Sequence, residues 1–210
     1  MKNKQLIIFD MDGTLIDSGD VISNTINYVR SNLGLSVMLK QELLESINNP
    51  DINSSEFFYG TKKFTDQQTK LFGEYYEENC VKDILLYDGI DLMLQEIQKY
   101  FTLSVATNAS VEYAKKMLNH LDIEKYFDFI IGANEVTNPK PHHEMLTVTT
   151  RKLNISISDA ILIGDSHKDS KAAISCNMDY LLVNWGFTQH NSKSVISNTR
   201  ELKDKILTLQ

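Results

Sequence analysis

Short apolar runs alternate with amphipathic segments along much of the chain, and this pattern predicts a mixed α/β fold. The run at residues 6–9 is wholly apolar and lies near the N-terminus, which is typical of a strand buried in a parallel sheet. From Tyr87 onward the pattern alternates between helix and strand. It begins with apolar residues on one helical face, at Ile90, Met93, Leu94 and Ile97.

The second part of the chain continues this alternation to about residue 183. Further strands are predicted at residues 101–106, 127–131, 160–163 and 180–183, and further helices at residues 111–121, 145–153 and 168–176. Ser110 is expected to cap the first of these helices. Strands that alternate with helices in this way form a parallel sheet covered on both faces.

Between the first strand and Tyr87, the chain has helical spacing and no strand-like runs. We expect four short helices here, one of them capped by Thr65. The sequence therefore predicts a core formed by residues 1–17 and 86–210. Residues 18–85 would be a helical domain inserted after the first strand.

Length and charge narrow the possible classes of protein. The 210 residues suffice for one α/β domain with a small insert, and the net charge of −7 disfavours binding to nucleic acid or to an anionic membrane. The cysteines, Cys80 and Cys176, form no metal-binding or secreted-protein pattern. The first apolar run is too short for a signal peptide. We expect a cytoplasmic protein.

Two aspartates directly follow the first predicted strand. Asp10 and Asp12 are separated by one residue, so in an extended segment both side chains can reach the same reacting group. Gly13 then allows a sharp turn. Open α/β sheets build their sites at the carboxyl ends of strands, which places Asp10 at a crevice. Acidic turns without any catalytic role also follow strands. The residues at the other strand ends are therefore needed to distinguish a catalytic site from an ordinary turn.

Polar side chains that can bind a phosphate occur at two further places in the chain. Thr107 and Asn108 come directly after the second core strand, where a hydroxyl, an amide and free backbone N–H groups can hold phosphate oxygens. Lys140 lies between Pro139 and Pro141, which restrict the backbone around it. Its ammonium group could neutralise both a nucleophile and a phosphate.

A second acidic pair follows the strand predicted at residues 160–163. Asp165 comes after Gly164, and Asp169 lies four residues further on, at the start of a predicted helix. Carboxylates near phosphate-binding groups suit Mg²⁺, although acidic residues are also common at helix starts because of the helix dipole. The combination of all four strand ends favours a phosphoryl-transfer site.

These motifs resemble those of the haloacid dehalogenase superfamily, in the subgroup similar to phosphoglycolate phosphatase and β-phosphoglucomutase. The matching segments are Asp10 to Leu15, Thr107 with Asn108, Lys140 with Pro141, and Gly164 and Asp165 with Asp169. The resemblance covers nearly the whole chain. It implies a Rossmann-like sheet and identifies residues 18–85 as a helical cap.

The resemblance also implies a mechanism. Asp10 is expected to attack phosphorus and form an aspartyl-phosphate, and Asp12 to protonate the leaving oxygen and then activate water. Thr107, Asn108 and Lys140 are expected to bind the phosphate oxygens. Mg²⁺ is expected to be bound by Asp10, the main-chain carbonyl of Asp12 and Asp165, with Asp169 acting through water or by orienting Lys140.

The expected activity is Mg²⁺-dependent hydrolysis of a small phosphorylated metabolite, such as phosphoglycolate or a sugar phosphate, by a monomer or homodimer. A phosphomutase of the β-phosphoglucomutase type keeps the same carboxylates and remains open. A catalytically silent phosphate sensor or interaction protein would usually lack the nucleophile or a metal ligand. Here Asp10, Asp12 and Asp165 are all present.

The substrate is expected to be selected by the helical segment, because the strand ends recognise only phosphate. The turn at residues 48–53 is expected to reach into the site. Phe57, Phe58 and Tyr59 are expected to pack inside the helical bundle rather than face a substrate.

Overall fold

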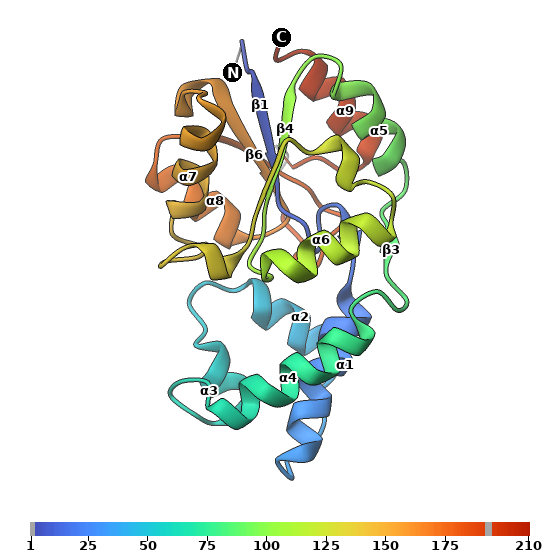
Figure 1. Ribbon diagram of the computed structural model, residues 1–210, viewed down its shortest axis with the longest axis vertical. Coiled ribbons are helices and arrows are strands. Elements are labelled where there is room, and N and C mark those ends of the chain that lie inside the picture. The colour runs from blue at the N-terminus through green and yellow to red at the C-terminus, as the bar shows by residue number, and fades with distance from the viewer. Residues whose placement is uncertain (1–2, 192–194) are drawn as a thin grey trace.

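A computed structural model of the protein describes residues 3–191 and 195–210, and its centre is a five-stranded parallel sheet (Figure 1). In spatial order, the strands are β5 (Phe129–Ile131), β4 (Thr102–Ala106), β1 (Leu6–Phe9), β6 (Ala160–Gly164) and β7 (Asp179–Leu182). All four residues of β1 are fully buried. A central parallel strand is covered on both faces, which explains its unbroken apolar run. The predicted α/β fold is confirmed.

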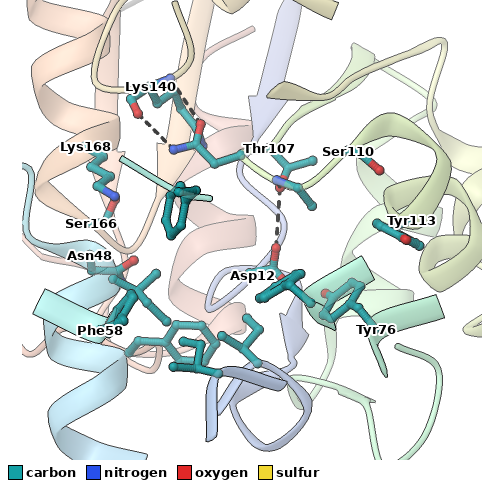
Figure 2. Close-up of a pocket in the computed structure, with 18 of the residues that line it drawn as sticks. Asp12, Asn48, Phe58, Tyr76, Thr107, Ser110, Tyr113, Lys140, Ser166 and Lys168 are labelled. Carbon is teal, nitrogen blue, oxygen red and sulfur yellow. Dashed lines mark hydrogen bonds between the residues drawn. The ribbon is translucent and has the colours of Figure 1, made fainter. Parts of the chain in front are cut away.

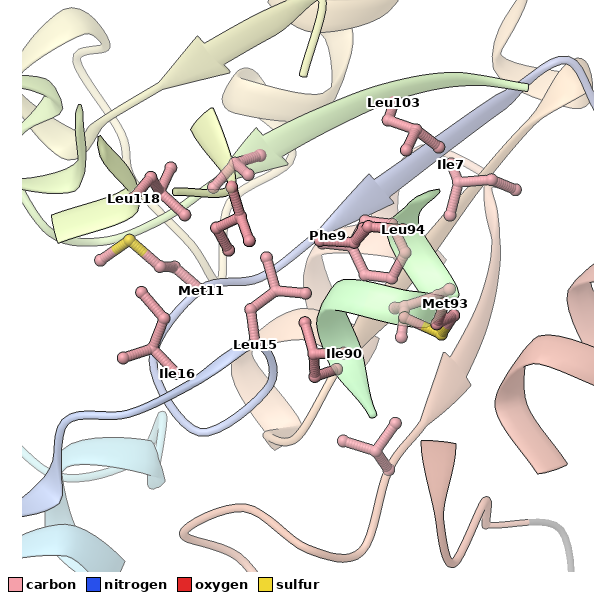
Figure 3. Close-up of a cluster of buried hydrophobic side chains, with 14 of the residues drawn as sticks. Ile7, Phe9, Met11, Leu15, Ile16, Ile90, Met93, Leu94, Leu103 and Leu118 are labelled. Atoms are coloured by element: carbon pink, nitrogen blue, oxygen red, sulfur yellow. The ribbon is translucent and has the colours of Figure 1, made fainter. Parts of the chain in front are cut away.

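The side chains of β1 alternate between two hydrophobic clusters, one on each face of the sheet. Ile7 and Phe9 belong to the larger cluster (Figure 3), and Leu6 and Ile8 to the other. The larger cluster is covered by α5 (Ile90–Ile97), α6 (Val111–His120) and α9 (Thr199–Leu207), and the other by α7 (Glu144–Leu153) and α8 (His167–Ser175). Short 3-10 helices in the connections span Glu124–Tyr126, Ala133–Glu135 and Ile157–Asp159.

The predicted core elements all occur within two residues of their expected bounds, but two details differ. Helix α9 was not expected. It begins where the side chain of Asn198 accepts a hydrogen bond from the N–H of Glu201, and it buries Leu202 and Ile206. Ser110 precedes α6 as expected, but its hydroxyl makes no capping hydrogen bond. The N–H of Val111 donates instead to Asn134 Oδ1 at 2.9 Å, so a distant amide replaces the local cap.

The segment between the first strand and Tyr87 contains four helices, which lie beyond the carboxyl ends of the sheet strands (Figure 1). They are α1 (Gly19–Asn32), α2 (Lys40–Asn48), α3 (Ser54–Tyr59) and α4 (Asp66–Asn79). The chain leaves the core through β2 (Ile16–Asp17) and returns through β3 (Leu85–Leu86), and these two short strands pair in an antiparallel ladder. Among the described residues, none of the helices is long and apolar enough to cross a lipid bilayer.

The four helices enclose a hydrophobic cluster of their own. It is formed by Ile26, Val29, Leu43, Phe58 and Tyr59. The predicted cap at Thr65 is confirmed, and it takes the form of a capping box with Gln68. The expectation for Phe57 is wrong: its side chain is 36% exposed, because the short helix α3 turns it outward while Phe58 faces the bundle.

Candidate active site

The site lies where β1 ends, between the ends of β4 and β6. In the sheet register, Phe9 pairs with Val105 on one side and with Ile163 on the other. Asp10, Thr107 and Asp165 therefore emerge at the same edge of the sheet. This edge is the crevice in which open parallel sheets bind ligands.

The turn after β1 depends on Gly13. Its φ of +81° lies in the left-handed region, and a Cβ atom added there would lie 2.4 Å from Asp165 Oδ2. Glycine is required at this position for two separate reasons, backbone conformation and space. The turn thereby brings the segment that carries Asp10 and Asp12 against the end of β6.

Lys140 lies at the centre of the charged groups and joins two buried carboxylates. Its Nζ is 2.7 Å from Asp10 Oδ1 and 2.6 Å from Asp169 Oδ1. All three side chains are nearly inaccessible to solvent. Burial alone would lower the pKa of the Lys140 ammonium, but the carboxylates of Asp10 and Asp169 raise it above its ordinary value, so the lysine remains charged.

The carboxyl group of Asp10 behaves differently from an exposed aspartate. Burial outweighs the lowering effect of the Lys140 ammonium and, together with the negative charge of Asp169, raises its pKa to about 7. Asp10 is therefore an unusually basic carboxylate held in a fixed position. Perturbed acids of this kind cluster at functional sites.

Asn108 positions Lys140 through its main chain. The Asn108 amide donates from Nδ2 to the Lys140 carbonyl at 2.8 Å, and the Lys140 N–H donates to Asn108 Oδ1 at 3.1 Å (Figure 2). Both ends of the amide are thus engaged with the protein. Sequence reasoning expected Asn108 to contact phosphate, and the structure gives it this additional positioning contact.

Asp169 is fixed from its own helix. Its Oδ2 accepts hydrogen bonds from the Ser166 hydroxyl at 2.6 Å and from the Ser166 N–H at 3.1 Å, which forms the capping box of α8. Gly164 is needed beside it, since an added Cβ there would lie 2.4 Å from Asp169 Cγ. Asp169 is thereby oriented toward Lys140, one of the two roles that the sequence suggested.

Asp12 lies on the open side of the site and is held by two hydroxyl groups. Ser18 donates to Oδ1 at 2.5 Å, and Thr107 donates to Oδ2 at 3.4 Å (Figure 2). Burial raises the pKa of the Asp12 carboxyl, and the hydrogen bond from Ser18 opposes that rise. A raised pKa favours a protonated carboxyl, which is the form that can donate a proton to a leaving group.

Asp10, Asp165 and Asp169 form what we call the acidic cluster. Each offers one carboxylate oxygen, and these three oxygens lie within 4.8 Å of one another. Asp165 Oδ1 is buried and accepts no hydrogen bond from the described residues, whereas its Oδ2 accepts one from the Phe187 N–H at 2.7 Å. Burial, followed by the charges of Asp10 and Asp169, raises the pKa of Asp165 well above its usual range. Several carboxylate oxygens with an unused acceptor fit a hard divalent cation.

Asn48 connects the helical segment with the acidic cluster. Its Nδ2 lies 2.9 Å from Asp165 Oδ2 and 3.0 Å from Thr188 Oγ1. In the same turn, Asp51 forms an ion pair of 2.8 Å with Lys171 of α8. The prediction that the turn at residues 48–53 reaches the site is confirmed at Asn48.

A cavity of about 480 Å³ opens between these groups and the four helices (Figure 2). On its core side it is lined by Asp10, Asp12, Thr107, Asn108 and Lys140. Asp165 and Asp169 lie behind these residues and are fully buried. The predicted site residues are therefore together, five of them on the cavity and two beneath it.

Sequence reasoning missed several contributors to the site. Ser18 and Ser166 carry no signal beyond being hydroxyl residues near predicted element starts, although Ser166 with Asp169 follows the spacing of a capping box. Phe187 follows the last strand and supplies both a backbone N–H to Asp165 and a side chain to the cavity. Lys168, at the start of α8, also lines the cavity.

Comparison with known proteins identifies the family. The model of the haloacid dehalogenase-like hydrolase family matches residues 7–183. The phosphoglycolate phosphatase of Aquifex aeolicus is 28% identical over 190 residues, which cover 90% of this chain and 89% of that protein. The phosphoglycolate phosphatase of Escherichia coli K12 is 25% identical over 205 residues, which cover 86% of this chain and 81% of the relative.

Solved structures agree with this result. The crystal structure of a predicted phosphatase from Clostridium acetobutylicum superposes with a TM-score of 0.87 at 26% identity, covering 97% of this chain and 98% of the other. A haloacid dehalogenase-like family protein from Streptococcus pneumoniae gives a TM-score of 0.83 at 24% identity, covering 98% and 99%, which supports the fold. The chain belongs to the haloacid dehalogenase-like hydrolase family and is an enzyme of that family.

Proposed function

We propose that this member of the haloacid dehalogenase-like hydrolase family is a Mg²⁺-dependent phosphatase that acts on a small phosphomonoester through an aspartyl-phosphate on Asp10. One observation carries the proposal: Asp10 opens onto a cavity, is held 2.7 Å from the Lys140 ammonium and belongs to the acidic cluster. The names of the relatives support the reaction class. Phosphoglycolate and sugar phosphates are the substrates that the family resemblance suggests.

In the first step, a carboxylate oxygen of Asp10 bonds to phosphorus as the bond from phosphorus to the alcohol oxygen breaks. Asp12 gives its proton to that leaving oxygen, and its raised pKa supports this role. The alcohol then departs with the proton. Lys140 and Thr107 stabilise the phosphoryl oxygens, and Asn108 contributes by fixing Lys140.

In the second step, Asp12 accepts a proton from water as the water oxygen bonds to phosphorus. The bond between phosphorus and Asp10 breaks, and inorganic phosphate is released with the Asp10 carboxylate restored. Asp12 thus alternates between acid and base. The Ser18 hydroxyl, which donates to Asp12 Oδ1, keeps the carboxyl in one position through both steps.

The metal would be held by Asp10, Asp165 and the main-chain carbonyl of Asp12, with Asp169 beneath them. When bound there, Mg²⁺ would offset the repulsion between the Asp10 carboxylate and an anionic phosphate. Asp165 Oδ1, which accepts no hydrogen bond from the described residues, supports this assignment.

We also infer that residues 1–17 and 86–210 form the catalytic core and residues 18–85 a cap. The separate hydrophobic cluster of the four helices and the ladder between β2 and β3 support this division. Small rotations at the ladder would admit the substrate and then exclude water.

The test is to trap the phosphoenzyme. The protein is mixed with a ³²P-labelled phosphomonoester and Mg²⁺, quenched in acid and analysed for label on the peptide that contains Asp10. We expect label in the wild-type protein, more of it in Asp12→Asn, and none in Asp10→Asn or in EDTA. The control variant Asp20→Asn changes an exposed aspartate of α1 and should match the wild type.

Other outcomes would assign other functions. Label in Asp10→Asn at the wild-type level would exclude Asp10 as the nucleophile. Isomerisation of a sugar phosphate without release of phosphate would indicate a phosphomutase. Binding of phosphate without turnover of any ester would indicate a silent sensor.

A further inference from the structure

The cavity has two chemically different ends. The core end carries the carboxylates, Thr107 and Lys140, whereas the opposite end is formed by side chains of the four helices (Figure 2). We call this second end the helical wall, and its apolar members include Ile22, Ile26, Phe58, Phe72 and Tyr76. In Figure 2, Phe58 and Tyr76 lie opposite Lys140 and Thr107, with Asp12 between them. A phosphate held at the core end therefore directs its alcohol toward the helical wall.

The helical wall has no positive charge among the described residues that line the cavity. The lining cations are Lys140 and Lys168, and both come from the core. Arg30 of α1 is directed elsewhere, because it donates to the carbonyl groups of Ser36 and Phe58. A carboxylate placed against the helical wall would lose its hydration and meet no cation there, which is unfavourable for a charged group. Esters of hydroxy acids therefore match this end poorly.

Aromatic rings dominate the helical wall. Phe72 and Tyr76 stack with centroids 5.4 Å apart, and Tyr76 forms a T-shaped pair with Tyr113 of α6, with centroids 5.0 Å apart. Across the wall, Tyr59 packs edge-on against Phe64 with centroids 6.0 Å apart. Such rings favour contact with another flat ring. The cavity, at about 480 Å³, falls within the range of small-molecule sites, roughly 300–1,000 Å³, and so has room for a ring beside a phosphate.

Two polar groups on the helical wall have hydrogen-bonding capacity that the described residues leave unused. Gln68 is buried, and its Oε1 accepts hydrogen bonds from the Thr65 N–H and the Thr61 hydroxyl, whereas its Nε2 donates to no described residue. The Tyr59 hydroxyl also lacks a described partner, and burial raises its pKa to about 12, so it remains a donor. Both residues line the cavity. Two donors beside aromatic rings suit a ring that carries acceptor atoms on its edge.

We infer that this enzyme acts on monophosphate esters whose alcohol carries an uncharged, flat heteroaromatic ring, and that it discriminates against esters of hydroxy acids such as phosphoglycolate. The inference rests on the proposed phosphatase activity and specifies its substrate class. Phosphate is recognised at the core end and the ring at the helical wall. Gln68 and Tyr59 act as specificity residues for the ring edge.

The first experiment compares kcat/KM for 2-pyridylmethyl phosphate, benzyl phosphate and phosphoglycolate with Mg²⁺. We expect both ring esters to exceed phosphoglycolate by about tenfold or more, because one good aromatic contact supplies about that factor. Equal or better turnover of phosphoglycolate, with label still trapped on Asp10, would overturn the inference and leave the phosphatase proposal intact. Absence of both turnover and label would overturn both.

The second experiment adds a cation to the helical wall. Phe64 is 55% exposed on the loop before α4, so Phe64→Arg should fold and place a guanidinium group at this end. We expect the ratio of kcat/KM for phosphoglycolate to that for benzyl phosphate to rise by about tenfold. The control Leu39→Arg adds the same charge at a 76% exposed position away from the cavity and should leave the ratio unchanged. Equal ratios in both variants would contradict the inference.

The third experiment tests the donor on Gln68. Gln68→Glu keeps an oxygen for the capping box but replaces the amide donor with an acceptor. The ratio of kcat/KM for 2-pyridylmethyl phosphate to that for benzyl phosphate should fall by about threefold or more, the value of one hydrogen bond. An unchanged ratio would remove Gln68 from ring recognition.

Discussion

Replacing Lys140 by methionine tests how the buried charges support one another. Methionine keeps most of the length and volume of the lysine stem and removes only the ammonium group. In the native structure that group lies 2.7 Å from Asp10 Oδ1 and 2.6 Å from Asp169 Oδ1, with all three side chains almost fully buried. Lys140→Met therefore leaves two neighbouring carboxylates without their shared cation.

The expected loss of stability is large for a single substitution. Removing one partner of a buried ion pair costs about 3–5 kcal/mol in the free energy of unfolding. For a chain of this size, each 1 kcal/mol lowers Tm by about 2–4 °C, so Tm should fall by roughly 10 °C. Protonation of Asp10 relieves part of the repulsion, since burial already raises the pKa of that carboxyl to about 7. The loss should therefore be smaller in mildly acidic buffer than in mildly alkaline buffer.

The assay is thermal and urea unfolding in EDTA, so that no divalent cation compensates for the lost charge. Lys171→Met is the matched control, because Lys171 forms an exposed ion pair of 2.8 Å with Asp51, worth about 0–1 kcal/mol. The double variant Lys140→Met/Asp169→Asn should recover part of the loss by removing one unpaired charge. The reasoning is refuted if Lys140→Met is as stable as the control, or if the second substitution recovers nothing.

Three further outcomes follow from the same geometry. Saturating Mg²⁺ should raise the free energy of unfolding, by about 2.7 kcal/mol when its concentration is 100 times Kd, and Asp165→Asn should remove most of this gain. If a thermal-shift titration showed an equal gain in that variant, the ion would bind elsewhere. In EDTA, the free energy of unfolding of the wild type minus that of Asp10→Asn should fall as pH rises from about 4 to about 7, because native Asp10 binds a proton that the unfolded chain, with a pKa of 3.8, has released. The difference removes the opposite trend of Glu112 and Glu144, whose pKa values are lowered by hydrogen bonds. A difference that rises over this range in chemical denaturation would contradict the raised pKa of Asp10. Gly164→Ala should displace Asp169, since the new Cβ would lie 2.4 Å from Asp169 Cγ. The displacement should lower kcat with little change in KM. Unaltered steady-state kinetics would show that the site tolerates the shift.

The sequence was most informative where one local pattern determines both structure and chemistry. The apolar run of β1 and the two aspartates after it define a buried strand and the end at which the proposed nucleophile lies, so Asp10 could be placed at the site without coordinates. The same holds for Asp165 after β6. Helix α9 was not predicted because its short apolar face, with Leu202 and Ile206, lies among many charged residues.

Contacts between distant segments could not be predicted in this way. The N–H of Phe187 binds Asp165, and the amide of Asn108 binds the main chain of Lys140, only because the sheet order brings their loops together. The aromatic helical wall was missed for a related reason. Phe58 and Tyr59 were assigned to the bundle interior, and they do pack there, but the same rings also border the cavity.

The ladder between β2 and β3 has an evolutionary consequence. Ile16 pairs with Leu86, so the polypeptide departs from and rejoins the sheet region at adjacent points. The intervening stretch can lengthen, shorten or be exchanged at little entropic cost without disturbing the neighbours of β1. Under the division of roles proposed above, natural selection can therefore remodel which alcohols are accepted while the groups that break the phosphate ester are inherited intact.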